Sequence, residues 1–158
     1  MGVGKTTVGR RLAKRLGLGF VDADEEIERA SGLTVEEIFS RFGEEYFRDG
    51  ERRVIARLVE DKRQVIATGG GAFMNDETRR LILDKAVAIW LDADLDTLVK
   101  RVARRNTRPL LKTGDPAKIL ADLATVRNPV YATAHIHVMG NDSPHEITVE
   151  KIIEALQR

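Results

Sequence analysis

Cysteine is absent from this chain of 158 residues, and several other compositional signals are weak. Without cysteine the chain has no disulfide framework and no thiolate metal site, which fits a reducing compartment such as the cytoplasm, where we expect the protein. Basic and acidic side chains number 26 and 25, so the net charge of +1 argues against bulk binding to nucleic acid or to an anionic membrane. No apolar run approaches a membrane span in length. The 42% of hydrophobic residues is enough for the core of a single domain, residues 1–158.

Helical and strand-like hydrophobic patterns alternate along the chain, without an internal repeat. The patterns predict strands at 20–21, 64–67, 86–91 and 135–139, and helices at 5–16, 34–42, 47–59, 76–83, 95–105, 115–126 and 143–156. Short apolar strands between helices predict an α/β fold, with a parallel sheet covered on both faces. Ligands of such folds bind at the carboxyl ends of the strands, where we expect three acidic or glycine-rich segments: 2–5, 22–24 and 69–71.

The first seven residues read MGVGKTT, and from Gly4 on they match the second half of a phosphate-binding loop, G-x-x-x-x-G-K-[ST]. In such a loop the N–H groups at a helix N-terminus bind phosphate. Lys5 would reach the terminal phosphates, and the hydroxyl of Thr6 would ligate Mg²⁺. The alternative is an ordinary helix start with an incidental G-K-T. An amphipathic helix and a strand ending in D-x-D follow the motif, which favours the nucleotide site.

Asp22 and Asp24 come at the end of the strand expected at 20–21. In extended backbone, residues two apart point to the same side. One carboxylate could then hold Mg²⁺ through water, and the other could accept a hydrogen bond from an acceptor hydroxyl and act as its base. The alternative for Asp24 is capping of the helix that follows, which would not explain Asp22. Asp92, after the strand at 86–91, we interpret as a loop or capping residue.

Arg48 and Glu51 lie three residues apart on the helix expected at 47–59. Either they form an ion pair on the helix surface, or Arg48 grips a substrate carboxylate while Glu51 orients it. These residues alone leave both interpretations open.

The TGGG segment at 68–71 is a stronger signal, because three glycines are entropically costly and need a reason. Close approach of the backbone to a ligand explains them better than a tight turn.

Basic residues cluster between positions 100 and 112, with no acidic residue between Asp96 and Asp115. A solvated face or a nucleic-acid patch is one interpretation, but the run contains no aromatic residue for base stacking. An arginine-rich loop, NTRPLL at 106–111, is more typical of a lid that closes over phosphates.

The segment RNPVY at 127–131 offers another arginine for a substrate carboxylate. The three histidines form no metal-binding pattern, and we interpret His135 and His137 as structural.

Six ordered signatures together resemble the shikimate kinase family, small P-loop kinases of the nucleoside-monophosphate-kinase type. They are GVGKTTVGRRLA at 2–13, FVDAD at 20–24, F-R-x-x-E at 47–51, ATGGGA at 67–72, NTRPLL at 106–111 and RNPVY at 127–131. The resemblance covers nearly the whole chain. It implies a three-layer α/β/α sandwich with strand order 2-3-1-4-5, a small lid at about 103–115 and a monomer. It also implies ATP- and Mg²⁺-dependent phosphorylation of the 3-hydroxyl of shikimate, in the biosynthesis of aromatic amino acids.

The resemblance further implies roles for particular residues. Residues expected at ATP and Mg²⁺ are Gly2, Val3, Gly4, Lys5, Thr6, Thr7, Arg101, Arg108 and, behind the metal, Asp22. Residues expected at shikimate are Asp24, at the reacting hydroxyl, Arg48 and Arg127, at the carboxylate, and Gly70 and Gly71, along the floor. Lys5, Asp24 and Arg108, the lid arginine that reaches the phosphates, are the expected catalytic residues. Arg101 would lie against the adenine.

In the family, further residues precede the position of Met1 and supply the first strand and the first P-loop glycine. We therefore expect the native protein to start upstream, and the 158-residue chain to fold poorly by itself. The alternative functions are another small-molecule kinase on the same fold, such as gluconate kinase, and a non-catalytic nucleotide- or RNA-binding module. Arginines that can bind a carboxylate favour shikimate over a polyol. The small net charge and the paired aspartates disfavour the binding module.

Overall fold

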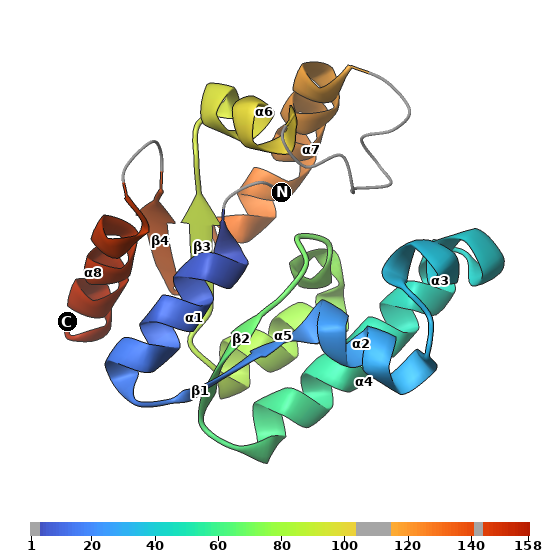
Figure 1. Ribbon diagram of the computed structural model, residues 1–158, viewed down its shortest axis with the longest axis horizontal. Coiled ribbons are helices and arrows are strands. Elements are labelled where there is room, and N and C mark those ends of the chain that lie inside the picture. The colour runs from blue at the N-terminus through green and yellow to red at the C-terminus, as the bar shows by residue number, and fades with distance from the viewer. Residues whose placement is uncertain (1–3, 104–114, 141–143) are drawn as a thin grey trace. The chain divides into compact units, whose positions relative to one another are not determined.

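The computed structural model describes residues 4–103, 115–140 and 144–158 (Figure 1). The chain folds into two compact units: residues 9–86, and residues 87–158 together with the N-terminal residues up to Val8. Helix α1 (Lys5–Leu16) begins in the second of these units and ends in the first. Across the described residues, no helix is both long and apolar enough to cross a membrane. Most of the lid expected at about 103–115 lies outside the described residues.

The unit of residues 9–86 is built on two parallel strands and the helices that follow them. Its elements are β1 (Gly19–Asp22), α2 (Ala23–Ser31), α3 (Val35–Phe42), α4 (Glu44–Asp61), β2 (Gln64–Ala67), the 3-10 turn η1 (Ala72–Met74) and α5 (Asp76–Lys85). The register of β1 and β2 runs from Gly19–Gln64 to Asp22–Ala67. Both strands therefore end at the same edge of the sheet, so that residues 22–24 and 68–71 leave it from neighbouring points.

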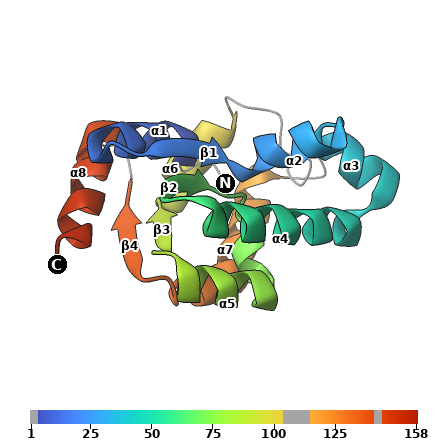
Figure 2. The ribbon, with the colours of Figure 1, turned by 90° about the horizontal axis from the view of Figure 1, so that it is seen from below.

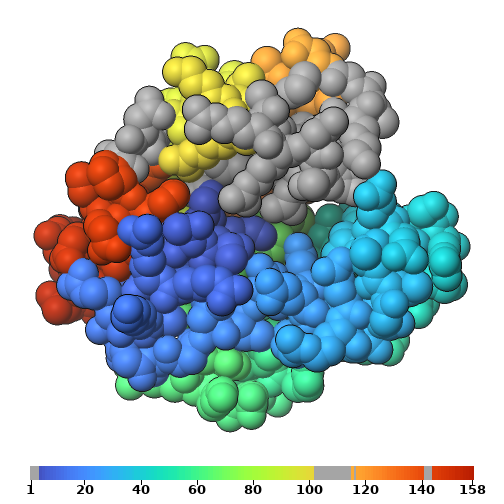
Figure 3. Space-filling model, in the orientation of Figure 1, coloured from blue at the N-terminus to red at the C-terminus, as the bar shows by residue number. Residues whose placement is uncertain are grey.

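Helix α4 supplies much of the apolar core of this unit. Ile55, which is fully buried, and Leu58 pack against Ala23 and Ala72. Nearer the start of α4, a second cluster joins Phe47 to Ile27 of α2 and Ile38 of α3. Figure 2 shows α4 running alongside α2, with α3 near one end of α4, and Figure 3 shows α2 and α3 packed together at the surface. The core thus fixes α4 against the segment that follows β1.

The unit that contains residues 87–158 also has two parallel strands. Its further elements are β3 (Ile89–Asp92), α6 (Leu95–Ala103), α7 (Pro116–Tyr131), β4 (Ile136–Met139) and α8 (His145–Leu156). The register of β3 and β4 runs from Ile89–Ile136 to Asp92–Met139. Leu120 of α7 is buried against Leu98 and Val99 of α6. The family's first strand was expected to precede Met1, so the observed strands β1 to β4 correspond to strands 2 to 5 of the order 2-3-1-4-5. The observed pairings β1–β2 and β3–β4 are then the pairings 2–3 and 4–5 of that order.

Local sequence signals fix several helix ends as predicted. Helix α1 spans the predicted residues, with Val8 and Leu12 buried, and it ends before Gly17, whose φ of +68° suits glycine. Thr34 and Glu37 form the predicted capping box at the start of α3: the Thr34 side chain accepts from the Glu37 N–H, and the Glu37 carboxylate accepts from the Thr34 N–H. These ends depend on neighbours in sequence, which is why the sequence predicts them.

Several boundaries differ from the predictions; α4, for example, spans Glu44–Asp61 where a helix at 47–59 was expected. The strand expected at 86–91 begins only at Ile89, because Ala86 ends α5 with a backbone hydrogen bond to Ile82 and Val87 is exposed. The helix expected at 115–126 continues to Tyr131, through Pro129. Helix α8 begins at His145 with Pro144 as its N-cap residue, and Ser143, expected in that cap, lies outside the described residues.

Candidate active site

Asp22 and Asp24 do not lie together on an extended strand, contrary to the prediction. Strand β1 ends at Asp22 and α2 begins at Ala23, so the backbone turns between the two aspartates. Asp22 itself caps α2: its Oδ1 accepts from the N–H groups of Asp24, at 2.9 Å, and Glu25, at 3.4 Å. The interpretation that capping would not explain Asp22 is therefore wrong. Asp24 lies within the first turn of α2, where it is not the capping residue.

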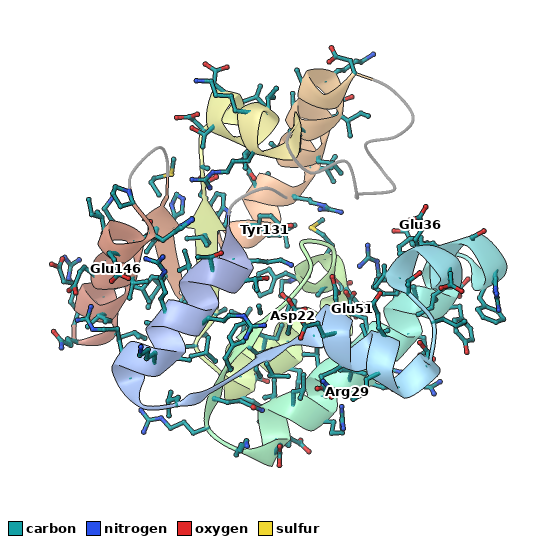
Figure 4. All side chains as sticks on the ribbon, in the orientation of Figure 1. Asp22, Arg29, Glu36, Glu51, Tyr131 and Glu146 are labelled. Atoms are coloured by element: carbon teal, nitrogen blue, oxygen red, sulfur yellow. The ribbon has the colours of Figure 1, made fainter. Side chains whose placement is uncertain are left out.

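The Asp24 carboxylate faces the glycine segment that follows β2. A Cβ added to Gly69 would lie 3.5 and 3.7 Å from the two carboxylate oxygens of Asp24, and 3.7 Å from Oε2 of Glu51. The Oδ1 atom of Asp24 is buried. Side chains from α2 and α4 therefore meet beside Gly69, and Figure 4 labels Glu51 close to Asp22, the residue that precedes α2. The parallel register of β1 and β2 accounts for the proximity of Asp24 to Gly69.

Arg48 and Glu51 form the ion pair that their spacing predicts, but the pair does not lie on an exposed helix surface. The Arg48 Nη1 atom donates to Glu51 Oε1 at 2.9 Å. The side chain of Glu51 is 3% exposed and that of Arg48 is 20% exposed. A second, longer contact of 3.5 Å joins Arg48 Nη2 to Glu44. A guanidinium held by a buried carboxylate is restricted in position, as a carboxylate-binding residue needs to be.

The Arg48 guanidinium fills the space that a side chain at position 71 would occupy. A Cβ added to Gly71 would lie 2.2 Å from Nη2, 2.4 Å from Cζ and 2.5 Å from Nη1 of Arg48. The backbone of Gly71 has φ −76° and ψ −17°, which any residue adopts, so its conformation does not require glycine. We expected the backbone of this segment to approach a ligand closely, which stays a prediction; the structure shows that the backbone at Gly71 closely approaches the Arg48 side chain. Gly70 lies between Gly69 and Gly71 in the same segment.

The Gly-Lys-Thr sequence begins α1, in the other unit. Gly4 has φ +78°, and its carbonyl accepts from the Val8 N–H at 3.0 Å, so that Gly4 directly precedes the helix. Lys5, Thr6 and Thr7 form the first turn of α1, where N–H groups point out of the helix along its axis. This is the arrangement that phosphate binding requires. Gly2 and Val3 lie outside the described residues.

Arg101 of α6 lies next to Gly4. Its Nη2 atom donates to the carbonyl of Gly140, after β4, at 3.1 Å. Its Nη1 atom would lie 3.9 Å from a Cβ added to Gly4. Arg127 lies within α7, and Arg108 lies outside the described residues, so their predicted roles stay predictions.

Asp92 is the last residue of β3 and does not cap the helix that follows. Its Oδ2 atom lies 3.0 Å from Nε2 of His137, on the paired strand β4. The residue at the start of α6 is Asp94, whose Oδ1 accepts from the Thr97 N–H at 2.8 Å. This hydrogen bond from the Thr97 backbone holds the pKa of the Asp94 carboxyl below its ordinary value. Helix α6, which carries Arg101, thus has a fixed beginning.

The side chains expected to hold Mg²⁺ are oxygen donors of the kind that this ion prefers. Mg²⁺ is usually held by one or two carboxylates together with substrate phosphates. The hydroxyl of Thr6 and the carboxylate of Asp22 fit this pattern chemically. They belong to different units of the chain, Thr6 at the start of α1 and Asp22 at the end of β1.

A Gly-Lys-Thr turn that begins a helix, and parallel strands with acidic and glycine-rich segments at their carboxyl ends, define the class of P-loop kinases for small molecules. The family model described as shikimate kinase matches residues 1–157. The chain belongs to the shikimate kinase family.

Individual relatives agree with this assignment. A shikimate kinase of Novosphingobium aromaticivorans is 56% identical over 162 residues, which cover 100% of this chain and 84% of that protein. The solved structure of shikimate kinase from Acinetobacter baumannii in complex with shikimate is 36% identical, covers 99% of this chain and 88% of that one, and has a TM-score of 0.93. These likenesses confirm the predicted P-loop α/β fold. A gluconokinase from Sinorhizobium meliloti, 18% identical with a TM-score of 0.62, covering 100% of this chain and 87% of that one, shares the fold alone.

Proposed function

We propose that the chain transfers the γ-phosphoryl group of ATP to the 3-hydroxyl of shikimate, giving 3-phosphoshikimate and ADP, in the biosynthesis of aromatic amino acids. The observation that carries the proposal is the position of the Arg48 guanidinium against Gly71 and beside buried Glu51. Family membership supports it, and so does the complex of the Acinetobacter baumannii relative with shikimate. Gluconate kinase is not favoured, because the gluconokinase likeness extends only to the fold.

Shikimate carries a carboxylate at one end of its ring and hydroxyls at the other, so its site needs a cation and a hydrogen-bond acceptor. Arg48 is the cation, since its planar guanidinium can form two parallel hydrogen bonds with a carboxylate. Asp24 is the acceptor: its carboxylate takes a hydrogen bond from the 3-hydroxyl, orients the oxygen and receives its proton as the bond to phosphorus forms. Gly70 and Gly71 form the floor, and Arg127 is proposed as a further carboxylate ligand.

The phosphate end of the reaction is assigned to the start of α1. The N–H groups of its first turn bind the phosphates of ATP, and the Lys5 ammonium stabilises the negative charge that develops on the transferring group. When bound, Mg²⁺ supplies further charge neutralisation, and Thr6 and Asp22 are its proposed protein ligands. Arg101 is proposed to lie against the adenine, and Arg108, in a lid at about 103–115, to reach the phosphates. We further propose a single domain that acts as a cytoplasmic monomer without a nucleic-acid partner.

A coupled assay of ADP release tests the proposal. The folded chain, checked by a cooperative thermal transition, is supplied with ATP and Mg²⁺ and with shikimate, gluconate or no acceptor. ADP release that depends on shikimate is expected. Release that depends on gluconate would favour the other kinase. RNA binding with a steep salt dependence and no ATP turnover would favour the binding module.

A further inference from the structure

The imidazole of His145 occupies the space in which a side chain at position 4 would lie. A Cβ added to Gly4 would lie 2.9 Å from Cε1 and 3.5 Å from Nδ1 of His145. Arg101 approaches the same point more distantly, at 3.9 Å. The His145 imidazole therefore lies closer than the Arg101 guanidinium to Gly4, the residue that directly precedes α1. No role for His145 follows from the sequence motifs.

The position of His145 is fixed by the helix that it begins. His145 is the first residue of α8, and the next turn of that helix buries Thr148 and Val149. Thr148 lies beside Gly140, the residue whose carbonyl holds Arg101: a Cβ added to Gly140 would lie 3.4 Å from Thr148 Oγ1. Figure 1 shows α8 beside β4, within the same unit. The imidazole thus approaches Gly4 from an element that is anchored in the core.

Glycine at position 4 needs such a restraint. Its φ of +78° is accessible to glycine, but glycine also reaches many other conformations at little cost. The Gly4 carbonyl is held in the helix by the Val8 N–H, at 3.0 Å, so a change in φ at Gly4 would turn the N–H group of Gly4 itself away from a bound phosphate. A ring packed against Gly4 opposes this change before the nucleotide arrives, and pre-organisation of this kind raises affinity.

We propose that His145 is a positioning residue of the nucleotide site, which packs against Gly4 and holds the Gly4 backbone in its phosphate-binding conformation at the start of α1. The inference rests on the proposed nucleotide site. It concerns the phosphates and not the base, because the backbone N–H groups of a phosphate-binding loop cradle the α- and β-phosphates. His145→Ala should therefore weaken the binding of ADP, which has a β-phosphate, more than the binding of AMP, which lacks one.

Calorimetric titration of ADP, AMP and shikimate into the wild-type chain and two variants tests the proposal. His145→Ala should weaken ADP binding about tenfold through lost pre-organisation, with a smaller loss for AMP and the affinity for shikimate nearly unchanged. The matched control is Ile147→Ala, an exposed residue two positions along α8, which should leave all three affinities unchanged. Thermal melts establish that each variant is folded.

Equal affinity of His145→Ala and the wild type for ADP would overturn the proposal, and so would an equal loss for ADP, AMP and shikimate, which indicates general damage. The glutamine side chain of His145→Gln is longer than that of alanine and can refill the space beside Gly4, so this variant should lose less ADP affinity than His145→Ala. An equal loss would show that packing is not the cause. If the wild-type chain itself fails to bind ADP more tightly than AMP, the proposed nucleotide site is wrong, independently of His145.

Discussion

Gly71→Ala is the substitution that most directly perturbs the contact between the glycine segment and Arg48. The new methyl group would lie 2.2 Å from Arg48 Nη2, whereas ordinary contacts begin at 3.4 Å. The backbone of Gly71 accepts alanine, with φ −76° and ψ −17°, and the three atoms nearest to the new methyl group all belong to the guanidinium. Because the clashing atoms are the end of a flexible side chain, the chain should still fold, with Arg48 displaced.

The size of this displacement sets the expected effect. Arg48 must move by about 1 Å to restore an ordinary contact, and this breaks or distorts its 2.9 Å hydrogen bond to Glu51. Misplacement of a substrate-binding group by about 1 Å can cost on the order of 100-fold in activity. Glu51, whose side chain is 3% exposed, would lose a charged partner in the protein interior. We expect a loss of about 1–3 kcal/mol in the free energy of unfolding from this second effect.

The assay compares the Michaelis constants for shikimate and ATP in Gly71→Ala and in Gly50→Ala. Gly50 lies on α4 between Arg48 and Glu51, and an added Cβ there meets nothing within 4 Å. Gly50→Ala should therefore keep both constants and gain about 0.5–1 kcal/mol of stability from helix propensity. Gly71→Ala should raise the constant for shikimate and leave that for ATP nearly unchanged. A wild-type constant for shikimate in folded Gly71→Ala would refute the carboxylate-binding role of Arg48.

Three further substitutions separate the proposed roles. Lys5→Ala should abolish phosphoryl transfer with the thermal transition nearly unchanged, since the ammonium stabilises charge on the transferring group; near-wild-type turnover would count against the phosphate site. Asp24→Asn should strongly lower the turnover number while ADP affinity, measured by titration, holds, because the amide cannot accept the proton of the hydroxyl; retained turnover would remove the base from the account. Thr34→Ala removes the capping box of α3 and should cost about 1 kcal/mol in a denaturant titration, with both Michaelis constants unchanged; a wild-type free energy of unfolding would contradict the capping role.

The sequence predicted what depends on neighbours along the chain. The bounds of α1 and β2 and the capping box of α3 came out as predicted, because periodicity and capping residues determine them locally. The start of β3 was predicted too early, since an apolar run does not show where α5 stops and the strand begins. Helix α7 was predicted too short, because its last turns include Pro129.

The candidate site was predicted in its members more than in its arrangement. Arg48, Glu51 and Gly71 stood out as residues, but that the guanidinium fills the space above Gly71 depends on contacts between α4 and the segment after β2. The capping role of Asp22 was missed because we expected the backbone to stay extended from Asp22 to Asp24, whereas α2 already begins at Ala23. His145 was missed as well, since its neighbour Gly4 is distant in sequence.

The identity of the phosphorylated product shows whether the chain transfers the phosphoryl group to the 3-hydroxyl of shikimate. The chain is incubated with ATP, Mg²⁺ and shikimate, and the product is examined by mass spectrometry and by phosphorus–proton NMR. We expect shikimate that has gained one phosphoryl group, with the phosphorus coupled to the proton on carbon 3. A phosphoryl group on another hydroxyl, or ADP release without phosphorylated shikimate, would contradict it.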